Sequence, residues 1–273
     1  MKNVKFVITD LDNTLLNNKK QISKLNHKAI QQLKENHIFF GLASGRDYES
    51  VKTLTKDWHI QDLVDVIIGA NGMQIYQMDE NILHYQKGIS KEIAWKIYET
   101  FKDSDGIYLA RNGFTRYQES TDADLHADAV KYQEPEKIVN LHEYLKTHDV
   151  DKVSIFCQPE QMPKMKKIAQ QLKGLPISMM QSSSHLLEFM DKDTNKGSGL
   201  KIACDILGIP VKSSMAFGDT TNDYSLIETA GIGVCMINGT DDVKEVADHI
   251  TKYTNNEDGF YHFIQENVFK KTF

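Results

Sequence analysis

The chain begins with short apolar segments that alternate with segments in which apolar residues recur at helical spacing. The apolar segments are residues 5–9, 38–42, 66–68 and 73–76. They are rich in β-branched and aromatic residues and are too short for helices, which predicts buried strands. Residues 25–33 and 48–54 have the spacing of one helix face, and Ser23 is placed to cap the first helix. Strands that alternate with helices predict a parallel sheet with right-handed crossovers.

The same alternation returns near the end of the chain. Residues 196–207 carry apolar side chains at i, i+3, i+4 and i+7, which predicts a helix. Strands are expected at 215–217 and 232–236, a short helix at 243–246 and a terminal helix at 259–269. We expect these elements to extend the sheet that the first strands form.

The middle of the chain has a different pattern. Short strands are expected at 107–109, 114–117, 153–157, 177–180 and 185–189, the last two as a hairpin. The strand at 153–157 alternates like a half-buried one. A few helices are mixed in, and the polar residues 119–136 predict no element. This mixture predicts a separate α+β domain.

The fold class is therefore α/β, with a doubly wound parallel-sheet core of residues 1–81 and 189–273. An inserted α+β domain of residues 82–188 interrupts this core. Two connections join the domains, near residues 82 and 188, so we expect a hinge between them.

Composition restricts the class of protein. The 273 residues, of which 40% are hydrophobic, suffice for two domains. The net charge of -6 argues against general nucleic-acid binding, which requires a basic surface. We find neither the apolar run of about 20 residues that a membrane span needs nor the apolar core of a signal peptide. The distant Cys157, Cys204 and Cys235 predict buried reduced thiols in a cytoplasmic protein.

Two carboxylates follow the first predicted strand. If the chain continued extended, Asp10 and Asp12 would point to the same side. Close carboxylates repel each other unless a cation lies between them or one carries a proton, which predicts metal binding and proton transfer. A Ca²⁺ loop is excluded, because Leu15 and Gln21 stand where it requires Gly and Glu. A solvated turn with a helix cap stays an alternative.

Polar residues also follow two other predicted strands. They are Ser44 and Gly45 after the second strand, and Asp219, Asn222 and Asp223 after the strand at 215–217. Because the carboxyl ends of parallel strands lie along one edge of a sheet, we expect these residues to meet at one crevice, with Lys196 beside them. Each has a simpler explanation when taken alone: Ser44 as a helix cap, for example, or Lys196 as a surface lysine.

Together these motifs resemble the haloacid dehalogenase-like superfamily of phosphohydrolases, in its Cof-like branch with a large α/β cap inserted between the second and third motifs. The matching segments are residues 10–14 (DLDNT), 44–46 (SGR), 71–72 (NG), 196–197 (KG), 218–223 (GDTTND) and 257–259 (EDG). The resemblance covers the core, whereas residues 82–188 match the cap in length and position only.

The resemblance implies Mg²⁺ as the cofactor and Asp10 as the nucleophile, which would form an aspartyl-phosphate. Asp12 would protonate the leaving oxygen and later deprotonate the attacking water. Mg²⁺ would be held by Asp10, Asp219 and the backbone carbonyl of Asp12, while Asp223 would orient the waters on the metal.

The resemblance also implies a set of groups that bind the phosphate. They are the side chains of Ser44, Asn222 and Lys196 and the N–H groups of Leu11 and Gly45. Lys196 would in addition neutralise Asp10. Arg46 is expected to pair with the acidic cluster rather than with the substrate.

The leading hypothesis is a Mg²⁺-dependent phosphatase that acts on a small phosphorylated metabolite, such as a sugar phosphate. A phosphomutase with the same first half-reaction and a non-catalytic phosphometabolite sensor are the alternatives. In the inserted domain, Arg111, Arg116 and Asp124 are candidates for contacts with the substrate. Neither a nucleic acid nor a membrane is expected as a partner, and the oligomeric state stays open.

Overall fold

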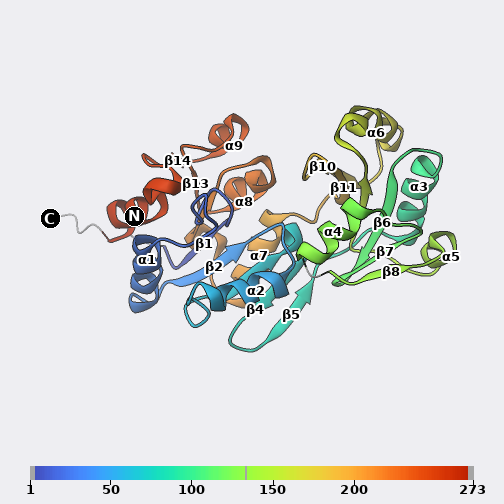
Figure 1. Cartoon of the computed structure of the whole chain (residues 1–273). Coiled ribbons are helices and arrows are strands. Elements are labelled where there is room, and N and C mark those ends of the chain that lie inside the picture. The colour runs from blue at the N-terminus through green and yellow to red at the C-terminus, as the bar shows by residue number, and fades with distance from the viewer. Residues whose placement is uncertain (1–3, 133, 270–273) are drawn as a thin grey trace. The chain divides into compact units, whose positions relative to one another are not determined.

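The computed structural model describes residues 4–132 and 134–269, and the chain divides into two compact units. The core unit combines Met1–Gln86 with Asn195–Phe273, and the inserted unit is the continuous segment Lys87–Thr194 (Figure 1). Each unit contains its own sheet.

Among the described residues, the core unit forms an eight-stranded sheet in the order β14-β13-β12-β1-β2-β3-β4-β5. Its strands are β1 (Phe6–Thr9), β2 (Phe39–Ala43), β3 (Val66–Gly69), β4 (Gln74–Gln77), β5 (Ile82–Tyr85), β12 (Ser214–Gly218), β13 (Ile232–Cys235) and β14 (His249–Ile250). The pairs from β14 to β3 are parallel, and β4 and β5 add an antiparallel edge. All four residues of the central β1 are buried.

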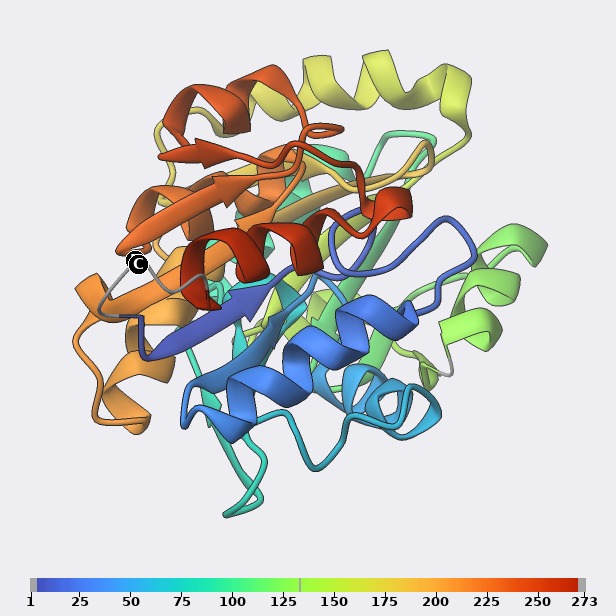
Figure 2. The same ribbon diagram turned by 90° about the vertical axis from the view of Figure 1, so that its left-hand side faces the viewer.

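Helices cover both faces of this sheet, so the predicted doubly wound α/β core is confirmed. They are α1 (Lys24–Glu35), α2 (Tyr48–Asp57), α7 (Lys196–Ile206), α8 (Tyr224–Thr229), α9 (Asp241–Val246) and α10 (Gly259–Ile264). Ile30 of α1, Val51 of α2 and Phe260 of α10 belong to the apolar cluster on one face. Leu200 of α7 and Ile227 of α8 belong to the cluster on the other. The distant helices α1 and α10 lie side by side (Figure 2).

The inserted unit forms a second sheet in the order β10-β11-β9-β6-β7-β8. Its strands are β6 (Ile107–Asn112), β7 (Thr115–Gln118), β8 (Glu136–Ile138), β9 (Lys152–Phe156), β10 (Ile177–Gln181) and β11 (Leu186–Asp191). Its helices are α3 (Lys91–Phe101), α4 (Ala123–Tyr132), α5 (Leu141–Leu145) and α6 (Met162–Ala169). Phe101, Ile155 and Phe189 belong to an apolar cluster inside this unit. The predicted hairpin is formed by β10 and β11, which pair antiparallel.

The boundaries of the units differ from the expected ones. The core unit continues to Gln86, rather than ending at residue 81, because β5 pairs with β4 in the core sheet. The inserted unit ends at Thr194 rather than at residue 188, because β11 continues to Asp191 in the sheet of that unit.

The polar stretch 119–136 is not irregular, because it contains α4. Leu125 of this helix packs against Leu109 and Phe156, which covers part of the second face of the inserted sheet. All five residues of β9 are therefore buried, whereas the alternating pattern predicts a half-buried strand.

The cysteines and the helices can be described in terms of burial and length. Cys157, Cys204 and Cys235 are buried free thiols, as predicted. None of the described helices is both long enough and apolar enough to span a membrane.

Candidate active site

Three neighbouring strands end at the same edge of the core sheet. β1 lies between β12 and β2, both parallel to it, and Thr9 at its end is in register with Leu42 and Phe217. Asp10 follows directly, and its N–H donates to the carbonyl of Phe217 at 2.9 Å. The segments that begin at Ser44 and Asp219 therefore lie on either side of Asp10.

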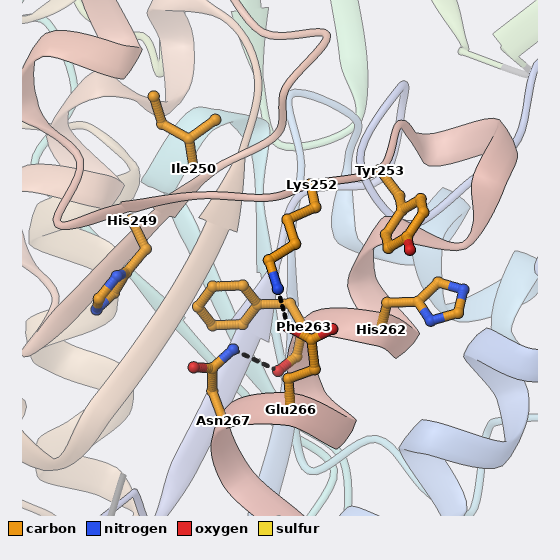
Figure 3. Close-up of a pocket in the computed structure, with 8 residues that line it drawn as sticks. All are labelled: His249, Ile250, Lys252, Tyr253, His262, Phe263, Glu266 and Asn267. Atoms are coloured by element: carbon orange, nitrogen blue, oxygen red, sulfur yellow. Dashed lines mark hydrogen bonds and ion pairs between the residues drawn. The ribbon is translucent and has the colours of Figure 1, made fainter.

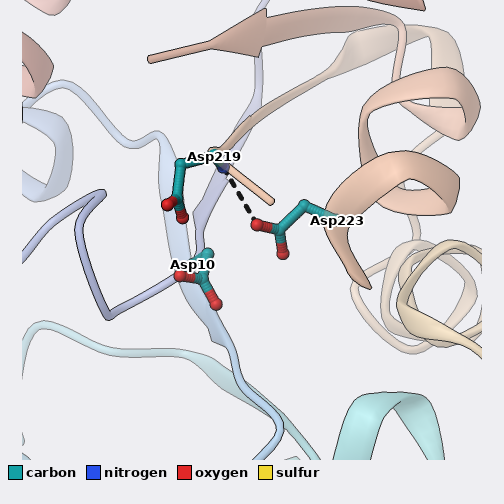
Figure 4. Close-up of side chains that lie close together, drawn as sticks. All are labelled: Asp10, Asp219 and Asp223. Carbon is teal, nitrogen blue, oxygen red and sulfur yellow. Dashed lines mark hydrogen bonds between the residues drawn. The ribbon is translucent and has the colours of Figure 1, made fainter. Parts of the chain in front are cut away.

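Three carboxylates form the centre of the site. Asp10, Asp219 and Asp223 are buried, and each places an oxygen within 4.8 Å of the others (Figure 4). Oδ2 of Asp223 accepts from the N–H groups of Asp219 and Thr220 at 3.0 and 3.2 Å. The hydroxyl of Thr14 donates to Oδ1 of Asp219 at 3.0 Å. These hydrogen bonds fix the directions of Asp219 and Asp223.

The ammonium of Lys196 neutralises part of this negative charge. It donates to Oδ1 of Asp10 and to Oδ1 of Asp223, both at 2.6 Å, and its side chain is fully buried. Lys196 is the first residue of α7, which the side chain of Asn195 caps by accepting from the N–H of Ser198 at 2.9 Å. When all three carboxylates are ionised, the centre has three negative charges and one positive charge.

Burial and repulsion shift the pKa values of the centre. Desolvation, followed by the charge of Asp223, raises the pKa of Asp10 to about 8, although Lys196 opposes this shift. The same two causes raise the pKa of Asp219 to about 6. Burial alone would lower the pKa of Lys196, but Asp10 and Asp223 outweigh it and raise that pKa above its ordinary value. The carboxyl groups are thus crowded by excess negative charge.

The donor set suits a hard divalent cation. Mg²⁺ prefers carboxylate oxygens, and its charge would favour the ionised forms that burial disfavours. Asp223 already accepts from Lys196 and from two backbone N–H groups. Asp10 and Asp219 have fewer such partners within the site, which makes them the better candidates for ligands.

Asp12 does not lie beside Asp10 in the way that an extended chain would place it. The strand ends at Thr9, and the following residues form a turn in which the N–H of Leu16 donates to the carbonyl of Leu11 at 2.8 Å. The expectation that the two carboxylates share one side of a continuing strand is therefore wrong. Asp12 is also not a member of the buried carboxylate cluster.

The carboxylate of Asp12 is instead held by two cations. Nη2 of Arg46 donates to both of its oxygens at 3.0 and 2.9 Å, and Nζ of Lys20 donates at 2.6 Å. Burial alone would raise the pKa of Asp12, but Lys20 and Arg46 outweigh it and hold that pKa below its ordinary value. Arg46 thus pairs with Asp12, which lies outside the buried carboxylate cluster.

The segment after β2 is fixed by side chains at the start of α2. Ser44 is buried, and its Oγ accepts from the N–H of Arg46 at 3.1 Å. The cap of α2 is Asp47, which accepts from the N–H of Glu49 at 2.9 Å, so Ser44 is not the cap of this helix. Nε2 of the buried Gln74 donates to Asp47 at 2.7 Å and ties the helix start to β4.

The amide of Asn222 lies between two polar side chains. It accepts from Oγ1 of Thr220 at 2.7 Å and donates to Oδ1 of Asn71 at 3.4 Å. The sequence reasoning did not assign Asn71 or Thr14 to the site. Both stand inside the matching motifs, Thr14 at the end of DLDNT and Asn71 in the NG pair, so a signal for them was present.

The residues proposed from sequence to contact the substrate already have partners within the inserted unit. Arg111 and Arg116 both pair with Glu134, the first at 2.6 Å. Asp124 accepts from Nε2 of Gln158 at 3.3 Å. The structure therefore gives these three residues a place in the inserted unit and does not assign them to a substrate.

A pocket in the core unit contains none of the predicted site residues (Figure 3). It is lined by His249, Ile250, Lys252, Tyr253, His262, Phe263, Glu266 and Asn267. The exposed Lys252 and Glu266 pair at 2.7 Å beside it. A buried acidic centre is a stronger sign of chemistry than this solvent-exposed pair, so we assign the functional site to the strand ends.

Fold and centre together define an α/β enzyme with carboxylates and a buried lysine at the carboxyl edge of a parallel sheet. The sequence pattern of the haloacid dehalogenase-like hydrolases matches residues 7–264. The chain therefore belongs to the haloacid dehalogenase-like hydrolase family, and it is a hydrolase of the phosphatase class.

Relatives of known name match nearly the whole chain. Phosphatase YwpJ of Bacillus subtilis is 29% identical over 292 residues, covering 96% of this chain and 99% of that protein. The 5-amino-6-(5-phospho-D-ribitylamino)uracil phosphatase YitU of the same organism is 28% identical over 268 residues, covering 95% and 96%. The crystal structure of a haloacid dehalogenase-like hydrolase from Bacteroides thetaiotaomicron superposes with a TM-score of 0.79 at 27% identity, covering 96% and 99%.

Proposed function

We propose that the chain hydrolyses the phosphomonoester of a small metabolite through an aspartyl-phosphate on Asp10, with Mg²⁺ as the cofactor. The observation that carries this proposal is the buried cluster of Asp10, Asp219 and Asp223 with Lys196 bonded to two of its members. A nucleophilic carboxylate divides one difficult hydrolysis into two easier steps.

Asp10 and Asp219, with the backbone carbonyl of Asp12, are the groups that would hold Mg²⁺. When bound, the cation supplies charge that reduces the repulsion between an anionic carboxylate and an anionic phosphate. Lys196 donates to Oδ1 of Asp10 at 2.6 Å and thereby restrains the position of that oxygen. Asp223 positions Lys196 and the start of the segment after β12.

In the first step, a carboxylate oxygen of Asp10 attacks phosphorus, and the bond from phosphorus to the leaving oxygen breaks. Asp12 gives its proton to that oxygen. In the second step, Asp12 takes a proton from water as the water attacks the aspartyl-phosphate, which releases inorganic phosphate and restores Asp10. Because Lys20 and Arg46 favour the ionised form of Asp12, the protonated form requires that these contacts loosen during turnover.

The phosphate oxygens are bound by groups from four segments. They are the N–H groups of Leu11 and Gly45 and the side chains of Ser44, Asn222 and Lys196. Donors that are fixed before the reaction stabilise a transition state without reorganisation, and the loss of one typically costs about 3–4 kcal/mol.

The substrate class that we propose is a phosphorylated sugar, polyol or similar small molecule. The name of YitU, whose substrate carries a phosphoribityl group, supports this class. The buried free cysteines agree with the cytoplasmic location that we propose.

The test is phosphate release from p-nitrophenyl phosphate in MgCl2. Asp10→Asn should lower kcat below about a thousandth of the wild-type value, because the amide is a poor nucleophile. EDTA should abolish wild-type turnover, and added Mg²⁺ should restore it. Asp57→Asn, at the exposed end of α2, is the matched control and should keep full activity. An active Asp10→Asn enzyme would refute the mechanism.

The same assay separates the two alternatives. A phosphomutase returns the phosphoryl group to a hydroxyl of its substrate, so steady release of inorganic phosphate without a bisphosphate activator excludes it. A sensor would bind phosphate without turnover. The presence of Asp10, Asp12, Lys196 and Asp219 together argues for the enzyme.

A further inference from the structure

Resting on the proposed function, we infer that Asn71 is a positioning residue of the phosphate site. It lies in the turn Ala70–Gly72, which connects β3 to β4. This turn contacts the segment Ser44–Arg46, the amide of Asn222 and the backbone that precedes Lys196.

The backbone of the turn fixes the segment after β2 on both sides of Gly45. The N–H of Asn71 donates to the carbonyl of Ser44 at 3.0 Å, and the N–H of Ala70 donates to the carbonyl of Arg46 at 2.7 Å. The carbonyl of Ser44 belongs to the same peptide group as the N–H of Gly45, so the first bond restricts the plane of that group, and the second fixes the peptide that follows Arg46. The direction of the Gly45 N–H, which the proposed function assigns to a phosphate oxygen, therefore depends on this turn.

The side chain of Asn71 makes the second connection. It is 8% exposed, and its Oδ1 accepts from Nδ2 of Asn222 at 3.4 Å. A Cβ atom on Gly45 would lie 3.1 Å from the same Oδ1, so the carboxamide packs directly against that glycine. One amide group thus touches both Gly45 and Asn222, and Thr220 fixes Asn222 from its other side at 2.7 Å.

The third connection is steric. A Cβ atom on Gly72 would lie 2.1 Å from the carbonyl oxygen of Asn195, the residue that caps α7 immediately before Lys196. The turn therefore packs against the start of α7 without any side chain between them. The residues Ala70, Asn71 and Gly72 thus support three of the proposed phosphate-binding groups, which belong to Gly45, Asn222 and Lys196.

The backbone conformation offers a competing explanation for an asparagine here. Asn71 has φ 53 and ψ 34, in the left-handed region that asparagine tolerates better than most residues. The residue could thus serve the turn alone. Glycine separates the two explanations, because it accepts this conformation without strain and has no carboxamide.

The experiment compares Asn71→Gly, Asn71→Ala and Asn222→Ala in the p-nitrophenyl phosphate assay. We expect Asn71→Gly to lower kcat/KM about tenfold or more, because Asn222 and Gly45 lose their common partner. The double variant Asn71→Gly/Asn222→Ala should lose less than the two single losses combined would give, since Asn71 acts partly through Asn222. A residue that serves only the turn would show neither the loss in the glycine variant nor this non-additivity.

The matched control is His37→Gly, which relieves a left-handed residue (φ 56) between α1 and β2, away from the site. It should keep wild-type kcat/KM. Asn71→Gly with wild-type kcat/KM, but Asn71→Ala with a lowered melting temperature, would overturn the inference. If the wild type itself releases no phosphate, the proposed function fails. Calorimetric titration with inorganic phosphate in MgCl2 then decides on Asn71, and equal affinity in wild type and Asn71→Gly would overturn its role.

Discussion

Asp10 is the residue on which the charge balance of the site depends. It is buried among two other carboxylates and one ammonium, and its pKa is raised to about 8 from an ordinary 3.8. Between these pH values the folded chain keeps a proton that the unfolded chain releases. As the pH rises between these values, release of this proton stabilises the unfolded state relative to the folded state. Asp10 therefore makes the free energy of unfolding of the metal-free protein fall between about pH 4 and about pH 8.

This argument predicts a pH-dependent effect of Asp10→Asn on stability. In EDTA, the free energy of unfolding of the variant relative to the wild type should increase from about pH 4 to about pH 8 and then level off, because the amide cannot ionise. Urea denaturation at several pH values measures it. Mg²⁺ should weaken the fall in the free energy of unfolding of the wild type with pH. The control Asp57→Asn should show the same pH dependence as the wild type. A difference that stays constant with pH would contradict the assignment.

At this scale the sequence predicted some placements and missed others. Asp10 and Asp219 could be placed because each directly follows a strand, and the strand order brings them together. The pairing of Asp12 with Lys20 could not be foreseen, because it depends on the turn that replaces an extended chain after Thr9. Asn71 was missed because an asparagine before a glycine is equally typical of an ordinary turn.

Among the elements, the contact between α7 and α8 fixes the position of the start of α7, where Lys196 lies. A Cβ atom on Gly197 would lie 2.3 Å from the carbonyl oxygen of Ser225 and 2.6 Å from Oγ1 of Thr229. Close approach of the two helices thus requires glycine directly after Lys196. At Gly199 the nearest obstacle, at 2.8 Å, is the Cγ2 methyl group of Ile68 rather than a backbone atom.

Gly197→Ala should therefore destabilise the fold. In a free helix the change would stabilise by about 1 kcal/mol, whereas forced displacement of packed backbone costs about 1–3 kcal/mol. Activity should fall as well, because the ammonium of Lys196 moves with the helix. Gly199→Ala is the matched comparison on the same helix and should lose less stability in urea denaturation. A larger loss for Gly199→Ala would show that the helix contact is not the controlling one.

Most core elements were predictable because their strands are mainly apolar and their helices are amphipathic. Elements with weaker patterns were not. The edge strand β5 has only four residues, ILHY, and none of them is buried, so it lacks the contrast of buried and exposed positions that marks a strand of the core. Helix α4 was hidden in a polar stretch, because the burial of Leu125 depends on contacts with Leu109 and Phe156 from distant strands.

For the molecule as a whole, the inserted unit is one continuous segment with its own sheet and apolar cluster. The core unit, by contrast, is assembled from two segments that the insertion separates. A continuous segment with its own core can be expected to fold alone.

We therefore predict that a fragment of residues 87–194 unfolds cooperatively, as measured by circular dichroism during urea denaturation. A fragment of residues 82–188 is the matched control. It lacks the end of β11, including the buried Phe189, and should be less stable by at least about 3 kcal/mol. A non-cooperative unfolding transition of fragment 87–194 would show that the inserted unit depends on the core unit for its stability.

The two ends of the insertion are held together within the inserted unit, where the hydroxyl of Thr194 donates to the carbonyl of Lys87 at 2.8 Å. Because entry and exit lie side by side, a module of almost any size can be exchanged at this position while the strand order of the host sheet is preserved. One segment can thus be replaced in evolution while the carboxylate centre of the core and Lys196 stay as they are.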